Sequence, residues 1–236
     1  MAVRLGRLIL VACAVLALAG VAPATPIAVF NTGVNGSGIP LANNTIGDPH
    51  YVLMSVPGGT TDIRVRTSAG GWPIGPWIAD DAISAWIGPA NDPILHPEWE
   101  CCGQTSGVGG PIGEYVYRTT FDLTGLDPIT AVLSGRWSTD DTGSDILLNG
   151  VSTGITITVP GYSAWSPIFI DSGFVSGINT LDFVVKNWDD VNQMGGPTGL
   201  RVEIEGRADP IPEPGTLLLL GSGLLVLARL VRKNAA

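Results

Sequence analysis

The amino-acid sequence predicts an all-β protein, an antiparallel two-sheet sandwich of jelly-roll type, flanked by an N-terminal signal helix and a C-terminal hydrophobic helix. Three observations carry this prediction. The middle of the chain alternates apolar and polar residues with period two, Gly and Pro interrupt it at short intervals, and no long helical pattern appears between the two ends. Because a strand with one apolar face buries that face against a second layer, two packed sheets are expected.

The alternation is clearest in four segments, 115–123, 155–159, 181–186 and 200–205. Each is predicted to be a strand with one buried face. In the last of them, the apolar residues at 200, 202 and 204 share one face, so Arg201 is expected on the opposite, polar face.

Turns and further strands complete the predicted domain. Asn149-Gly150 is the dipeptide preferred at a two-residue hairpin turn. Residues 51–56 predict a further strand, and Trp86 and Trp137 fall in strand-like alternation and are expected in the core. Residues 88–113 are rich in Pro, Gly and Asn, which predicts a long loop of the kind that often carries binding sites.

The N-terminus has the order of a secretory signal. Arg4 and Arg7 precede an apolar run, and Ala22 and Ala24 are small residues at the spacing of a cleavage site. Residues 1–24 are therefore predicted to be a signal peptide removed after Ala24. A lipoprotein is the competing interpretation, because residues 10–13 end in Cys13 with the order of a lipobox, but the apolar stretch before this cysteine is very short.

The C-terminus combines Pro212-Glu213-Pro214, an apolar run over 217–227 and basic residues at 229, 232 and 233. Some 15 helical residues from Thr216 rise about 22 Å, less than the bilayer core of about 30 Å, so residues 210–236 predict a short and marginal transmembrane helix. Because positive charge lies outside both apolar runs, both ends are expected in the cytoplasm and the middle outside it.

This tail resembles the PEP-CTERM sorting tail of exported proteins in Gram-negative bacteria. The resemblance implies export across the inner membrane, a transient stay there, processing by an exosortase-like enzyme, and release to the cell envelope surface or extracellular matrix. The alternative is a permanent short C-terminal anchor, which the Pro-Glu-Pro tripeptide disfavours.

Without its two ends the chain is one predicted domain, 25–209. Twenty of the 21 acidic residues but seven of the 12 basic residues lie within 25–211, so that stretch has a net charge of −13. Such a charge argues against nucleic acid and anionic lipid as partners, and it is compatible with divalent cations or neutral glycans. A need for solubility explains the same charge equally well. Cys101 and Cys102 are the cysteines of this domain; a vicinal disulfide and two unpaired or intermolecular thiols both remain open.

Residues 137–150, which run from a Trp through three aspartates to Asn149-Gly150, resemble a strand–loop–strand segment of galactose-binding-like jelly rolls. The resemblance covers about 114–206. It implies a fold and a tendency toward glycan binding, but it transfers no sugar site, because members of such folds differ in where they bind.

Three carboxylates, Asp140, Asp141 and Asp145, crowd the predicted hairpin. Carboxylate oxygens are ligands that Ca²⁺ prefers, so a calcium site is a candidate here, although the spacing is not that of an EF-hand. The alternative is a solvated turn whose aspartates hydrogen-bond the local backbone.

Five tryptophans lie beside Gly, Pro or Asp and are candidates for stacking on sugar rings: Trp72, Trp77, Trp99, Trp165 and Trp188. The alternative is that these indoles fold down over the ends of the sandwich, since Trp is usually largely buried.

The sequence offers little for catalysis. His50 and His96 are the two histidines, each beside a proline, and the sequence contains no nucleophile elbow or phosphate loop. We therefore expect a non-enzymatic surface or matrix protein that serves adhesion or contacts glycans such as exopolysaccharide. A calcium-dependent carbohydrate-binding module and a secreted glycosidase are the alternatives.

Overall fold

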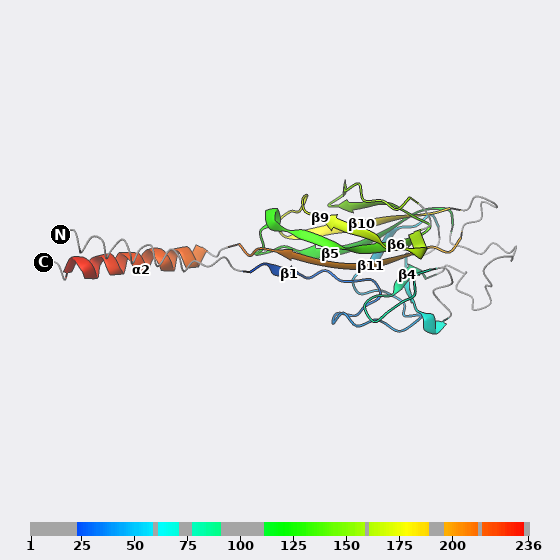
Figure 1. Cartoon of the computed structure of the whole chain (residues 1–236), viewed down its shortest axis with the longest axis horizontal. Helices are drawn as coiled ribbons and strands as arrows, with labels where there is room; N and C mark the ends of the chain where they lie inside the picture. Colours follow the sequence, from blue (N-terminus) through cyan, green and yellow to red (C-terminus); the bar gives the residue numbers. More distant parts are fainter. Residues whose placement is uncertain are drawn as a thin grey trace. The chain divides into compact units, whose positions relative to one another are not determined.

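The computed structural model describes residues 23–58, 61–70, 77–90, 111–158, 161–188, 196–211 and 214–233. Residues Thr25–Ala208 form one compact unit, and the chain on either side of it belongs to a second. The first unit is the two-sheet antiparallel sandwich that the alternating pattern predicts (Figure 1).

The first sheet has the strand order β3-β4-β11-β6-β9, with β1 also paired to β11. Its strands are β1 (Thr25–Ile27), β3 (Ile63–Arg66), β4 (Trp86–Pro89), β6 (Val132–Asp140), β9 (Ser166–Ile170) and β11 (Gly199–Ala208). The longest pairing joins β11 to β6, which run side by side over nine residue pairs from Gly199 opposite Asp140 to Arg207 opposite Val132.

The second sheet has the order β2-β5-β10-β7-β8. Its strands are β2 (Val52–Ser55), β5 (Gly113–Asp122), β7 (Thr142–Leu148), β8 (Val151–Ser152) and β10 (Ile178–Asn187). In the described part of the chain, the 3₁₀ turns η1 (Ser68–Gly70), η3 (Pro128–Thr130) and η4 (Gly161–Ser163) lie between strands, and α2 (Pro214–Lys233) is the helix of the C-terminal tail.

The core lies between the sheets. Trp137 of β6 reaches across it to Phe183 of β10, with ring centroids 5.8 Å apart. Beneath the indole lies Gly143 of β7, where a Cβ would overlap the ring carbons of Trp137. Trp137 is fully buried in this core, as predicted, whereas Trp86 is fully buried in a separate cluster with Trp77.

The predicted hairpin at Asn149-Gly150 is confirmed. Leu148 of β7 pairs with Val151 of β8, and the two turn residues have φ of 53° and 78°. Both values lie in the left-handed region that a type I′ turn requires, and this is why Asn and Gly occupy the turn. The strand predicted within 51–56 is also present, as β2.

One predicted strand is wrong. In place of a strand over 155–159, Ile157 makes a single bridge to Gly143, and Val159 lies outside the described residues. Gly154, with φ of 73°, turns the chain directly after the short strand β8 and ends its pairing. Of the predicted loop over 88–113, residues 88–89 belong to β4 and 113 to β5, while 91–110 lie outside the described part.

We expect Gly143→Ala to lower the free energy of unfolding by about 3 kcal/mol, because an added methyl group overpacks the contact with Trp137. Urea unfolding monitored by tryptophan fluorescence measures this loss. The control is Gly36→Ala, since a Cβ at Gly36 meets nothing within 4 Å. Equal stability of the two variants would contradict the close packing of the two sheets at Gly143.

Candidate functional site

The sorting tail begins its helix within the predicted motif. Helix α2 starts at Pro214, a residue suited to the first turn of a helix, whereas Pro212 and Glu213 lie outside the described residues. Arg232 and Lys233 occupy the last turn. At the other end of the chain, Ala24 directly precedes β1, while Ala22 and the rest of the predicted signal peptide lie outside the described part.

The short transmembrane helix predicted within residues 210–236 stays a prediction, and α2 is the helix found there. Within the part of the chain that the structure describes, no helix combines the length and the apolar character needed to cross a bilayer.

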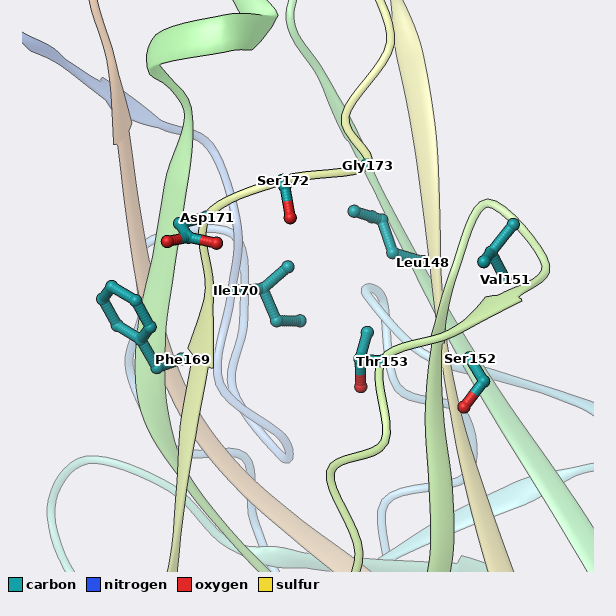
Figure 2. Close-up of a pocket in the computed structure, with 9 residues that line it drawn as sticks. All are labelled: Leu148, Val151, Ser152, Thr153, Phe169, Ile170, Asp171, Ser172 and Gly173. Atoms are coloured by element: carbon teal, nitrogen blue, oxygen red, sulfur yellow. The ribbon is translucent and has the colours of Figure 1, made fainter.

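A pocket of about 270 Å³ opens at one edge of the sandwich, between the β7–β8 hairpin and the end of β9 (Figure 2). Its lining comes from two stretches of chain and consists of Leu148, Val151, Ser152, Thr153, Phe169, Ile170, Asp171, Ser172 and Gly173. The two stretches belong to different sheets, so the pocket lies where the sandwich is open between its edge strands.

The floor of the pocket is apolar and its wall is polar. Leu148 and Ile170 are buried, and Figure 2 shows their side chains pointing toward each other across the pocket. The hydroxyl of Ser172 points into the same space, whereas Phe169 lies on the other side of the β9 ribbon. Asp171 is exposed and supplies the single carboxylate among the nine lining residues.

Hydrogen bonds fix the two walls relative to each other. The side-chain amide of Asn149 donates to the carbonyl oxygen of Gly173 at 3.1 Å and to Oδ1 of Asn179 at 2.8 Å, and its own Oδ1 accepts from the backbone N–H of Thr180 at 3.0 Å. Thr153 Oγ1 donates to the carbonyl oxygen of Ile146 at 2.8 Å. The turn residue that shapes the hairpin therefore also holds the loop that follows β9, so the pocket is formed before any ligand arrives.

The three carboxylates of the predicted calcium site each face a different environment. Asp140 is buried at the end of β6, Asp141 Oδ2 accepts from the backbone N–H of Trp188 at 2.7 Å, and Asp145 Oδ1 accepts from the N–H of Ile146 at 2.8 Å. Within the described ranges, no group of three acidic, His or Cys side chains is placed to hold a metal ion. The calcium site stays a prediction from sequence.

The candidate glycan-stacking tryptophans separate into different environments. Trp77 is buried against Trp86, with ring centroids 4.3 Å apart, so its indole covers the sandwich as the alternative interpretation expects. Trp165 is half-buried and Trp188 is exposed. Trp72 and Trp99, as well as Cys101 and Cys102, lie outside the described residues, and their predicted roles remain predictions.

Sequence reasoning missed a polar cluster on the outer face of the first sheet. Arg201, expected on a polar face, is fully buried there. Its Nε donates to Ser84 Oγ at 2.8 Å, its Nη1 donates to the carbonyl oxygen of Ala79, and its Nη2 lies 3.1 Å from Asp81 Oδ2. The guanidinium also lies 4.9 Å from the ring centroid of Trp165. The segment 78–85 therefore lies over the sheet. Arg201 fastens it there, together with hydrogen bonds from Ser84 Oγ to Glu203 Oε1 and from the Asn31 amide to the carbonyl oxygen of Ile83.

Burial, hydrogen bonding and ion pairing together set the pKa of Arg201 and of Asp81 in this cluster. Desolvation lowers the pKa of Arg201, while the carboxylates of Asp81 and Glu203 act to raise it. For Asp81, desolvation acts to raise the pKa, but the N–H groups of Ile83 and Ser84 together with Arg201 outweigh it, so the net pKa lies below the ordinary value. Both partners therefore stay charged at neutral pH.

Arg136 extends the cluster to the surface. Its Nε donates to Glu203 Oε2 at 2.7 Å, and its guanidinium lies 4.4 Å from the ring centroid of Trp165. Trp165 thus lies against two guanidinium groups, an arrangement that stabilises the loop before β9. No local pattern signals this cluster, because Ser84 and Arg201 are 117 residues apart in the sequence and Arg136 and Glu203 are 67 residues apart.

Comparison with known proteins bears on the tail. Residues 210–233 match the PEP-CTERM protein-sorting motif. The motif marks the chain as a protein exported across the inner membrane to the cell envelope or extracellular surface, where it is processed by an exosortase-like enzyme. A search of curated proteins found no match. The two-sheet sandwich fits the galactose-binding-like resemblance of the central segment, but no relative supports that resemblance.

We expect Arg201→Met to lower the free energy of unfolding by about 3 kcal/mol, because it leaves Asp81 and Ser84 without their buried partner. Thermal or urea unfolding measures the loss. Arg207→Met is the matched control, since Arg207 lies on the same strand and is exposed. A variant at 201 that is as stable as the variant at 207 would show that the cluster does not hold the segment 78–85.

Proposed function

We propose that the exported sandwich is a non-enzymatic surface or matrix protein that contacts glycans, including exopolysaccharide, through the pocket between β8 and β9. The observation that carries the proposal is the lining of this pocket, an apolar floor of Leu148 and Ile170 beside the hydroxyl of Ser172 and the carboxylate of Asp171. A sugar ring presents apolar C–H faces and hydroxyl groups, which match such a mixed surface.

The size of the pocket supports a single sugar residue. Its volume of about 270 Å³ falls just below the range of roughly 300–1,000 Å³ in which drug-sized ligands bind. The pocket is open to solvent at the edge of the sandwich, so the remainder of a polysaccharide chain can extend away from it.

A binding role is favoured over hydrolysis by the same lining. Glycoside hydrolysis uses two carboxyl groups on either side of the scissile bond, and Asp171 is the single carboxylate among the pocket residues. One carboxylate also makes a weak cation site, so we expect glycan contact here to be independent of calcium.

A binding titration tests the proposal. Residues 25–209 are titrated with bacterial exopolysaccharides and their constituent monosaccharides, and Asp171→Asn is expected to weaken the response about tenfold because a charge-assisted hydrogen bond to a sugar hydroxyl is lost. Glu114→Gln is the control, because Glu114 is an exposed carboxylate on β5, outside the pocket lining.

Two results would overturn the proposal. One is a lack of response to every glycan with the unaltered domain. The other is equal weakening by the substitutions at 171 and 114, which would place any glycan contact outside the pocket. A response that chelation of calcium abolishes would instead support the calcium-dependent module.

A further inference from the structure

Four aliphatic side chains project from loops of the sandwich into solvent. Ile129 of η3, Ile178 at the start of β10, Val151 of β8 and Val175 of the β9–β10 loop expose 87%, 71%, 69% and 47% of their surface. We call these four residues the apolar rim. Burying such side chains is favourable by roughly 25 cal/mol per Å², so four of them gathered at one end of the sandwich form an apolar surface that a partner can cover.

Strand register places the rim at one end of the sandwich. In the second sheet, Ile178 pairs with Asp122, the last residue of β5, and β7 ends at Leu148 opposite Leu181, beside the hairpin that carries Val151. The N–H of Leu123 donates to the carbonyl oxygen of Gly177 at 2.9 Å, which joins the loop after β5 to the loop before β10.

The first sheet brings Ile129 to the same end. Turn η3 leads into β6, whose first residues pair with the last residues of β9 and β11: Leu133 lies opposite Ile170, and Val132 lies opposite Arg207. Figure 1 shows η3 at the end of the sandwich where β1 begins and β11 finishes. Because Thr25 pairs with Ala208, both ends of the domain's chain leave from this end.

The direction of the chain identifies the partner. Ala208 is followed, after residues 209–213 alone, by α2 of the sorting tail, the segment that addresses the protein to the membrane. We propose that the apolar rim rests on the lipid bilayer surface while the sorting tail is attached. The tail raises the effective concentration of the rim at the bilayer, so four aliphatic side chains suffice for contact. Removal of the tail then releases the domain, because so small an apolar surface binds lipid only marginally by itself.

Charge defines the lipid class. The rim segments 123–131, 149–153 and 171–178 contain no Lys or Arg, while Asp127 and Asp171 lie within them and Asp122 directly precedes the first. Arg207, which lies opposite Val132 at the same end, is outnumbered by these three carboxylates, so anionic headgroups repel this end of the domain. The contact is expected to be strongest on a zwitterionic surface.

Hydrogen exchange of the full chain reconstituted in phosphatidylcholine vesicles tests the proposal. In the double variant Ile129→Ser/Ile178→Ser, the exchange rate is measured at the amides of residues 150–152, which neither substitution alters. We expect exchange there to become roughly tenfold faster, because two of the four inserted side chains are lost. Ile39→Ser, at an isoleucine of the 35–39 loop that exposes 59% of its surface, is the control and should leave these amides unchanged.

Addition of phosphatidylglycerol to the vesicles should speed exchange at residues 150–152 of the unaltered chain. Equal exchange in the unaltered chain and the double variant, or slower exchange with phosphatidylglycerol, would overturn the proposal. Protection that appears in native membranes and not in pure lipid would assign the rim to a membrane protein and overturn it as well. All variants should unfold at the temperature of the unaltered chain, because the substituted residues are exposed.

Discussion

The contact between Trp137 and Gly143 is the constraint on which the domain depends. The indole of β6 crosses the core from the first sheet and lies on the bare backbone of β7 in the second, beside Phe183. Chain connectivity makes this contact possible, because β6 ends at Asp140 and β7 begins at Thr142, so the chain passes from one sheet to the other between them. The position of β7 then sets the β7–β8 hairpin, which forms one wall of the pocket at the sandwich edge.

Polar contacts outside the core fix the positions of segments on the outer faces and at the edge of the sandwich. On the outer face of the first sheet, Arg201 fastens the segment 78–85 through Ser84 and Asp81. On the outer face of the second, Arg118 and Asp182 form a two-point ion pair with distances of 2.6 and 2.7 Å. At the sandwich edge, Asn149 joins the hairpin to the loop after β9. Each of these groups joins segments that the sequence separates by 20 residues or more, so they fix tertiary arrangement rather than secondary structure.

Local chemistry explains what the sequence could predict. Alternation identified β5, β10 and β11, and the left-handed φ values that Asn149 and Gly150 adopt made their turn recognisable. The alternation over 155–159 predicted a strand that is absent from the described residues 155–158, because a strand needs a neighbour to pair with. Gly154 turns the chain after β8, and of these residues only Ile157 makes a bridge, to Gly143. The burial of Arg201 and the pocket below Asn149 were beyond reach, since both arise from segments that meet only after folding. For the tail, the order of three local features was sufficient, and the sorting motif matches there.

We infer that the working molecule is the acidic sandwich, which reaches the cell surface with the aid of sorting signals at the two ends of the chain. The compact unit ends at Ala208 and the sorting motif begins at residue 210, so the segment where processing is expected directly follows the sandwich in the sequence. Mass spectrometry of the protein recovered from the cell surface identifies both ends of the mature chain. We expect a polypeptide that begins at Thr25 and lacks the apolar run from Leu217. Recovery of a surface polypeptide that retains residues 217–233 would contradict this inference.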